Sequence, residues 1–564
     1  MTTIDRPDGP GRPARRHRAR QTDRSIGAGR RDRARQTDRR IATTVRRALA
    51  VVLAVGTVAA GTLADRHAVV DAPVAFGERV DLPMPALRPA ASLGASWFCP
   101  GVPAVDAAAG GVVVLANPTD NPVSTSVTVT ASDAAVAPVV RDVTVPERGH
   151  VELAVTEFVT APFAAVQVEA RSGALVVEQR AAGKLDAQAA TVYSVSPCAT
   201  APSENWYFAD GSTTTEADET LLVYNPFPDD AVVDLVFSDD AGVRRPPTLQ
   251  SRPIPAGSLV AVNVGATIQR KELVSVGLHA KVGRVVLGRY QVYSSKPRRT
   301  LVAGLATPSA GQTWTFADGE RVAGDAPGSA STTFAVYNPG ADDAQVTVTV
   351  LPESGSAIAG LTAPVAADPS AAAVDPAAAA TDPNAAPVVP DTAAVAPDPN
   401  TVTVTVAAGT SVLVPLDKVP NGRFSSLVTS SAPIVVERQL VRVGDPRVVT
   451  TVQFGSRLSS TRWAFATAAV GSWTGTLIVA NPAPRAGTVS VQVLSAAGLA
   501  PVAGMTDLPV PATGSIRIDL GPAGVGSAAI VVDATTDVVV ERLLAPPADQ
   551  PGSASSLGMP VVAA

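Results

Sequence analysis

The feature that most constrains the fold of this chain is a fourfold repetition that begins each time with a tryptophan. Trp97, Trp206 and Trp314 follow one another at intervals of 109 and 108 residues. Trp463 lies 149 residues after Trp314, and the same period returns once a 40-residue insert at 361–400 is set aside. Self-similarity at a fixed period indicates that one structural unit recurs along the chain. We therefore expect four units, and we call them the first to fourth unit: residues 97–205, 206–313, 314–462 and 463–564.

Each tryptophan is followed by an apolar run that ends in Asn-Pro. An Asn side chain bonds nearby backbone while Pro fixes φ, which is turn chemistry. One tryptophan at the start of each unit is most simply a buried core residue or a contact between units. We therefore interpret these residues as a structural repeat motif: Trp97, Trp206, Trp314, Trp463, Asn117, Asn225, Asn338 and Asn481. Val-rich runs close the units, and we expect their arginines Arg289, Arg438 and Arg542 to pair with acidic residues of the repeats.

The strand signals inside a unit are short and closely spaced. Val and Thr alternate at 346–350 and 402–406, which favours sheets with one buried face. In the second unit we expect strands near 220–225, 231–238, 247–253, 258–264, 272–281 and 284–293. Such units of about 100 residues predict a mainly β protein made of four tandem immunoglobulin-like antiparallel β-sandwiches. A β-propeller is the rival, but its blades have less than half this period. Because the linkers are short, we expect the units to abut in a rod or a compact row.

The insert at 361–400 differs in composition from the rest of the chain. It holds fifteen Ala and eight Pro, with Asp-Pro beginning at 368, 375, 382 and 398. Proline at this density opposes both helix and sheet. We expect a disordered surface loop that separates two strands of the third unit.

An uncharged apolar run at 48–64 follows a segment, residues 1–47, that contains fifteen Arg and five Asp. Seventeen helical residues cover about 25 Å, the short end of what spans a bilayer. The basic flank predicts a transmembrane signal-anchor with the N-terminus in the cytoplasm and the bulk extracytoplasmic. Residues 65–96 would then be a juxtamembrane linker. Two alternatives remain: cleavage of the segment, which would give a secreted protein, and a buried core helix.

The tail at 1–47 lacks apolar periodicity, so we expect it to be disordered. It repeats RARQTDR at 18–24 and 33–39. Its charge suits docking on anionic lipid or on a cytoplasmic partner, and a topology signal enlarged by duplication explains it equally. The net charge of −5 is the balance of this basic tail and an acidic remainder. No folded nucleic-acid-binding motif accompanies the tail, so we expect no nucleic acid partner.

Cys99 and Cys198 are the two cysteines of the chain. In an extracytoplasmic setting they would most simply form one disulfide. Closing a loop of about 100 residues contributes roughly 4.7 kcal/mol in the chain-entropy account.

We find no sequence pattern that indicates catalysis or a cofactor. Four His leave little material for zinc clusters or His-based catalysis, and none of them joins a constellation: His17, His67, His150 and His279. An acidic stretch of Asp210, Glu216, Asp218 and Glu219 is a candidate for cation binding, but it lacks calcium-loop spacing. We therefore expect no catalytic, cofactor-binding or metal-binding residues, and no enzyme.

The repeated Trp-x-Phe-Ala-Asp-Gly and Asn-Pro motifs, behind a signal-anchor with an Arg-rich tail, resemble a family of uncharacterised actinobacterial envelope proteins, known as a domain of unknown function. The resemblance covers about 97–564 and rests on Trp206–Ser212, Tyr224–Pro226, Trp314–Gly319 and Tyr337–Pro339. The first and last units depart from it, with CPG and ATA in place of ADG. It implies the location and the fold, and it brings no catalytic residues.

The leading hypothesis for function is a non-enzymatic, membrane-anchored scaffold or protein-interaction module of the cell envelope. The alternative is a module that binds cell-wall glycan, which predicts exposed Trp or Tyr platforms. An enzyme is the third hypothesis, because a β-sandwich is able to host many kinds of site.

Overall fold

The fold described below comes from a computed structural model, which describes residues 82–87, 95–105, 110–170, 175–185, 191–239, 242–295, 299–353, 398–444, 448–547, 550 and 552–562. Asp81–Ala564 forms one compact body that contains all four units. It is mainly β, with several antiparallel sheets. The predicted tail at 1–47 and the apolar run at 48–64 lie outside the described residues. Among the residues that are described, no helix is long and apolar enough to cross a membrane.

The first unit contains two four-stranded antiparallel sheets. One has the order β1-β6-β3-β4, and its strands are β1 (Ala95–Ala104), β6 (Ala161–Ala170), β3 (Val123–Ala131) and β4 (Val139–Val145). The other has the order β5-β2-β7-β8, with β5 (Gly149–Ala154), β2 (Val112–Asn117), β7 (Val176–Lys184) and β8 (Thr191–Pro197). A 3₁₀ turn, η1 (Val155–Glu157), follows β5.

The second unit also pairs into two sheets. The first contains β12 (Gly242–Arg244), β11 (Ala231–Asp239), β15 (Ser275–Val282) and β9 (Asn205–Phe208) in that order, with β13 (Arg252–Ile254) beside β11. The second has the order β14 (Leu259–Asn263), β10 (Ala217–Tyr224), β16 (Val286–Tyr293) and β17 (Thr300–Leu305). The strand expected at 247–253 is instead a 3₁₀ turn, η2 (Pro247–Leu249), followed by β13, because a proline at the first position starts the turn.

In the third and fourth units one long strand belongs to two sheets. β24 (Gly422–Val443) pairs first with β18 (Gly311–Phe316), β19 (Glu320–Arg321) and β21 (Ala344–Pro352), then with β20 (Ala330–Tyr337) and β25 (Val448–Phe454). β22 (Thr401–Val406) pairs with β21, and β23 (Ser411–Pro415) with β20.

β32 (Ile530–Ala545) has the same double role in the fourth unit. It pairs first with β26 (Ser460–Phe465) and β28 (Gly487–Ser495), then with β27 (Thr474–Asn481) and β33 (Ala554–Leu557). The remaining strands are β29 (Gly498–Pro501) and β30 (Leu508–Val510) on β28, β31 (Gly514–Asp519) on β27, and β34 (Met559–Pro560) on β26.

The burial of each strand follows from its sequence pattern. β3 and β21 alternate Val with Ser or Thr, and they bury mainly the Val side, as a strand with one solvated face does. β10 and β27 instead end in runs that are buried at every position. Such strands are covered on both faces.

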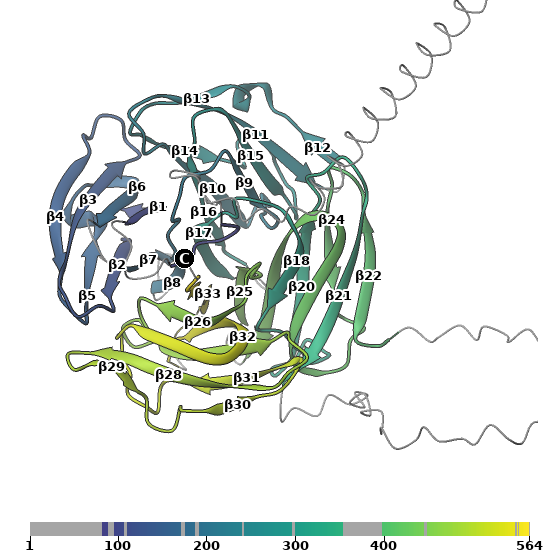
Figure 1. The fold of residues 1–564 in the computed structure, drawn as a ribbon. Helices are drawn as coiled ribbons and strands as arrows, with labels where there is room; N and C mark the ends of the chain where they lie inside the picture. The colour runs from purple at the N-terminus through teal and green to yellow at the C-terminus, as the bar shows by residue number, and fades with distance from the viewer. Residues whose placement is uncertain are drawn as a thin grey trace, which may run out of the picture. The chain divides into compact units, whose positions relative to one another are not determined.

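The last strands of the four units lie against one another. β8 contacts β17, β17 contacts β25, β25 contacts β33, and β33 contacts β8; Figure 1 shows these strands grouped near the middle of the picture. The fourth unit therefore packs against the first as well as the third. We expected a rod or a compact row, and the contact between the fourth and first units rules out the rod. Short linkers bring neighbouring units together, but they do not determine the angle between them.

The predicted linker at 65–96 is partly wrong, because its end takes part in the fold. β1 begins at Ala95, and Leu87 pairs with Val561 near the C-terminus. The backbone N–H of Leu87 donates to the carbonyl of Pro560 at 2.9 Å. Most of the insert at 361–400 lies outside the described residues, but Asp398–Asn400 form the turn that enters β22.

Candidate functional site

The four motif tryptophans are 0–3% exposed, and they fill the interior between the sheets. The indole N–H of Trp206, Trp314 and Trp463 donates to the backbone carbonyls of Val285, Ile434 and Val538 at 2.7, 3.1 and 2.9 Å. In the described part of the first unit, Nε1 of Trp97 has no hydrogen-bond partner. The tryptophan strand is thus joined by its side chain to the Val-rich strand of the same unit.

The four motif asparagines are 0% exposed and clamp two turns together. In each case Nδ2 donates to the carbonyl four residues ahead, at 2.7–2.9 Å. Nδ2 also reaches a carbonyl in the later turn of the unit, for example that of Ile254 from Asn225 at 3.0 Å. Oδ1 accepts from the N–H two residues ahead. Both ends of each amide therefore bind the backbone of the chain's own turns.

Buried Arg–Glu pairs join successive units, and we call them seam pairs. Arg289 Nη2 contacts Glu437 Oε1 at 2.7 Å, Arg438 Nη2 contacts Glu541 Oε1 at 2.7 Å, and Arg542 Nη2 contacts Glu178 Oε2 at 3.1 Å. All six side chains are 0–3% exposed. The third pair joins the fourth unit to the first.

The Ala-Asp-Gly turn sits on the seam pair of its unit. Glu437 Oε2 accepts from the backbone N–H of Ala209 and Asp210 at 2.9 and 2.7 Å, while Arg289 donates to the Asp210 carbonyl. Arg438 donates to the Asp318 carbonyl at 2.6 Å. The guanidinium of Arg289 also lies over the Phe208 ring, 4.4 Å from its centroid. The Trp-x-Phe-Ala-Asp-Gly motif therefore supplies the backbone groups and the aromatic ring that contact the seam pair.

The contact between the first and second units lacks a seam pair. Gln179 and Gly288 occupy the positions of the arginine and the glutamate. Both polar atoms of the Gln179 side chain have no partner among the described residues. Pro100 packs on Gly288, where an added Cβ would lie 2.6 Å from Pro100 Cγ. Cys99, beside Pro100, forms the predicted disulfide with Cys198, which confirms that expectation.

The acidic stretch considered for cation binding is divided by the fold. Glu216 and Asp218 are exposed, whereas Asp210 and Glu219 are 0% exposed. Asp210 Oδ1 accepts from Gln439 Nε2 at 2.7 Å. Within the described residues, Asp210 Oδ2 and both carboxylate oxygens of Glu219 have no partner. No group of three or more His, Cys, Asp or Glu that is able to hold a metal ion occurs in that part of the chain.

Glu219 lies beneath Gly211, where a Cβ would come within 2.6 Å of Oε2. Burial raises the pKa of Glu219 to about 8; Arg289 lowers it, while Asp210, Glu437 and Asp218 raise it further. Its carboxyl is therefore mostly neutral at pH 7.

A larger charge network surrounds Asp318 between the third and fourth units. Arg442 Nη2 lies 2.9 Å from Asp318 Oδ1, and Arg517 Nη2 contacts the same oxygen. Arg517 Nε also meets Glu353 Oε2 at 2.9 Å. Burial alone would raise the pKa of Asp318, but Arg442, Arg517 and Arg438 together hold it well below its usual range. Asp318 is thus an ionised group that fixes two arginines.

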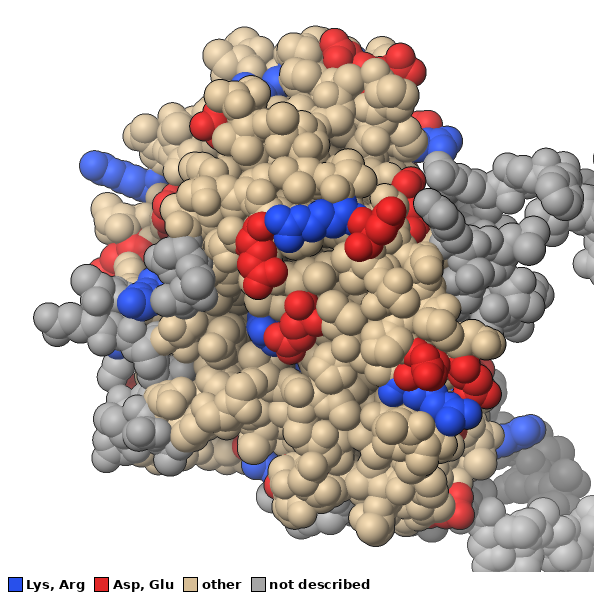
Figure 2. Space-filling view, turned by 90° about the vertical axis from the view of Figure 1, so that its left-hand side faces the viewer, with Lys and Arg blue, Asp and Glu red and all other residues tan. Residues whose placement is uncertain are grey.

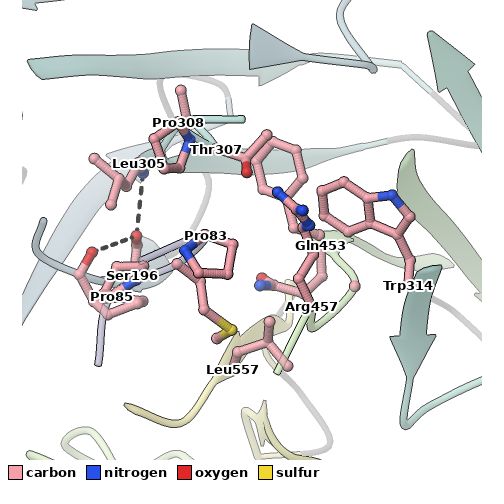
Figure 3. A pocket seen from close by; sticks show the side chains of 15 residues that line it. Pro83, Pro85, Ser196, Leu305, Thr307, Pro308, Trp314, Gln453, Arg457 and Leu557 are labelled. Atoms are coloured by element: carbon pink, nitrogen blue, oxygen red, sulfur yellow. Dashed lines mark hydrogen bonds between the residues drawn. The ribbon is translucent and has the colours of Figure 1, made fainter. Parts of the chain in front are cut away.

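A small cavity of about 50 Å³ lies beside the last strands. Figure 3 shows it between Pro83, Leu305, Leu557 and Arg457, with Trp314 beyond the arginine. The Arg457 guanidinium is 5.6 Å from the Trp314 ring centroid. This volume has room for a few waters only. The segment before Leu87 lines this cavity beside the last strands of the units. The cavity is too small to be a candidate substrate site.

The surface of the first unit carries charges in opposed pairs. Figure 2 shows one face on which acidic and basic side chains lie side by side among uncharged residues. Arg148 Nε meets Asp120 Oδ1 at 2.7 Å, and Arg180 Nη2 meets Glu152 Oε2 at 2.9 Å. This face is not a single-sign patch.

The sequence indicated that the terminal arginines pair with acids, but it did not say that each acid belongs to the next unit. The signal was present. Neighbouring strand residues point to opposite faces, so a Glu-Arg dyad offers one charge to each neighbour. The Glu-Arg dyads at 437–438 and 541–542 have this form. At the contact between the first and second units, Gln179 and Gly288 stand at the positions of the arginine and the glutamate.

Comparison with known proteins gives a family match over part of the chain. No curated protein matches the sequence. One similar structure is titled "Crystal Structure of Thermotoga maritima 1070", with 17% identity, 26% of this chain and 94% of that chain covered, and a TM-score of 0.17. Another is titled "Crystal structure of tetra-tandem repeat in extending region of large adhesion protein", with 12% identity, 83% and 100% coverage, and a TM-score of 0.09. Likeness this low carries no argument about fold or function. Residues 184–397, which include the second unit and the start of the third, match DUF5719, a family of unknown function.

Proposed function

We propose that the chain is a non-enzymatic cell-envelope protein whose β-sandwich units act as a scaffold or protein-interaction module. The four units are tandem immunoglobulin-like sandwiches in this proposal. The observation that carries it is the recurrence of the seam pair at three of the contacts between units. Breaking one buried pair costs about 3–5 kcal/mol, since it leaves an unpaired buried charge. Units joined in this way would hold partner-binding surfaces in one relative arrangement.

The use of the motif residues supports the same proposal. The motif Trp side chains fill interiors, the Asn side chains clamp turns, and the Arg and Glu side chains join units. What recurs in this chain is thus a set of structural contacts. Repeat proteins commonly place binding surfaces on such a framework.

Membrane attachment is part of the proposal and rests on sequence. The run at 48–64 would act as a signal-anchor, with the Arg-rich tail at 1–47 in the cytoplasm near anionic lipid. Cleavage would instead release the same units as a secreted protein.

The second candidate function is binding of cell-wall glycan. It requires exposed aromatic platforms. The tryptophans Trp97, Trp206, Trp314, Trp463 and Trp473 are all at most 3% exposed, which favours the interaction module over this alternative.

In-cell photocrosslinking tests the interaction module. A photoreactive residue would replace Val140 or Val243, which are 61% and 39% exposed, in the full-length chain. Buried Val113 is the matched control, because it is 0% exposed. We expect discrete protein adducts from an exposed position and none from Val113. Adducts only to wall polysaccharide would support the alternative. A purified activity abolished by single substitutions would overturn the non-enzymatic proposal.

A further inference from the structure

A second, larger cavity lies between the third and fourth units, away from the motif residues. Its volume is about 520 Å³, within the usual range for small-molecule sites. It includes the side chains of β24, β25, β27, β31 and β32. Three arginines line it: Arg423, Arg442 and Arg517. We call it the arginine cavity.

Carboxylates behind the cavity hold these arginines in position. Arg442 Nε lies 2.5 Å from Glu320 Oε2, and Arg517 Nε lies 2.9 Å from Glu353 Oε2. Arg423 Nε reaches Glu320 Oε1 at 3.4 Å. The side chains of Asp318, Glu320 and Glu353 are 0%, 14% and 11% exposed. A supporting layer of this kind preorganises donors for a ligand.

The outer edges of the three guanidinium groups keep donors available. Among the described residues, Nη1 of Arg442 and of Arg517 and both Nη atoms of Arg423 make no hydrogen bond. Asp519 is the acidic residue that lines the cavity, and it is exposed. The acids behind the arginines offset their charge without using these N–H groups.

The repeat framework does not require these arginines. Arg442 lies four residues after the seam residue Arg438, whereas Tyr293 and Pro546 lie four residues after Arg289 and Arg542. Arg517 likewise corresponds to Ala261 and Leu413 in the second and third units. The network around Asp318 is therefore an addition to this one contact between units.

We propose that the arginine cavity binds a small molecule that carries a carboxylate or phosphate group, of about the size of a sugar acid or a sugar phosphate. Planar guanidinium groups match the oxygens of these anions in pairs, and charge assistance strengthens each hydrogen bond. Thr476 supplies a hydroxyl in the lining, and Leu543 and Val449 supply apolar surface. The site does not depend on the scaffold function, so either proposal stands if the other fails.

Isothermal titration calorimetry on the full-length chain at low salt tests the site. The probes are glucuronate, glucose 6-phosphate and inorganic phosphate, with neutral glucose as the control ligand. We expect binding of at least one anion and none of glucose, with affinity falling as salt is added. The comparison of phosphate with glucose 6-phosphate tells whether the anion alone suffices.

Two variants locate the binding. Arg423→Gln should weaken it about tenfold, which corresponds to about 1.4 kcal/mol, and Arg423 is 49% exposed, so folding is preserved. Arg462→Gln is the matched control, because Arg462 is 45% exposed and pairs with Asp533 at 3.3 Å; it should leave affinity unchanged. Arg517→Lys keeps the charge, loses the planar fork and should also weaken binding.

The proposal is overturned if no anion binds, if glucose binds as well as the anions, or if R423Q and R462Q have equal effects. Thermal melting of each variant shows whether the fold is intact.

Discussion

At the scale of single residues, the motif side chains direct their polar groups at the backbone. The indole N–H of Trp206 donates to Val285, and the amide of Asn225 satisfies two turns. Buried polar groups need such partners, because an unsatisfied group costs about 1–3 kcal/mol. The recurrence of Trp and Asn in the sequence therefore reflects hydrogen bonds that apolar residues of similar size cannot make.

Trp206→Phe and Trp97→Phe form a matched pair of substitutions. Both remove ring volume from a buried position, but only Trp206 donates a hydrogen bond among the described residues. We expect W206F to lower the free energy of unfolding by about 1 kcal/mol more than W97F does, because it removes a buried hydrogen bond and leaves the Val285 carbonyl with the Ser203 N–H as its remaining donor. Chemical denaturation of both variants measures the difference. Equal losses would mean that the indole bond contributes nothing.

Glu219 should make stability depend on pH. Its pKa in the folded chain is about 8, above the ordinary value of 4.5, so the folded state holds a proton that the unfolded state releases. Its contribution is therefore complete below about pH 4.5 and is lost as pH rises towards 8, by about 1.4 kcal/mol per unit. Asp210, Glu437, Arg289 and Asp218 are the charged groups that influence it.

Glu219→Gln keeps the shape and removes this proton. Denaturation between pH 5 and pH 9 should show a smaller slope for E219Q than for the unmodified chain, with the variant the more stable of the two above pH 8. Identical slopes would show that Glu219 is not the titrating group.

At the scale of elements, the sequence predicted the strands well where alternation was clear. The expected strands at 231–238 and 284–293 correspond closely to β11 and β16. The stretch at 247–253 was wrong, since Pro247 starts a 3₁₀ turn. The candidate site was harder to predict. Arg442 and Arg517 lie 75 residues apart and meet through Asp318, and no local pattern contains that contact.

The disulfide belongs to this scale, because it joins β1 to the end of β8 beside the contact that lacks a seam pair. Replacing Cys99 and Cys198 by serine should lower the free energy of unfolding by up to about 4 kcal/mol, as expected for a loop of this length. Denaturation with and without reductant measures it. The unmodified chain should lose stability in reductant, and the double variant should show no response. An unaffected parent chain would argue against a stabilising role for the disulfide.

At the scale of the whole body Asp81–Ala564, the decisive feature is that the fourth unit contacts the first unit as well as the third. β33 packs on β8, and Leu87 pairs with Val561. The sequence predicted four units, but it did not predict that the fourth meets the first, because repeat spacing carries no information about the angle between neighbours. The seam pairs do show which units meet, because the arginine of each pair belongs to one unit and the glutamate to its neighbour.

The Arg542–Glu178 seam pair is the most direct test of this closure. A double-mutant cycle would compare the full-length chain with Arg542→Met, Glu178→Gln and the double variant by chemical denaturation. The two side chains lie 3.1 Å apart and are 0% and 2% exposed. We predict a coupling energy of about 1–3 kcal/mol, as for buried partners in contact. Additive effects, with a coupling energy near zero, would show that the fourth unit does not close on the first and would contradict the account.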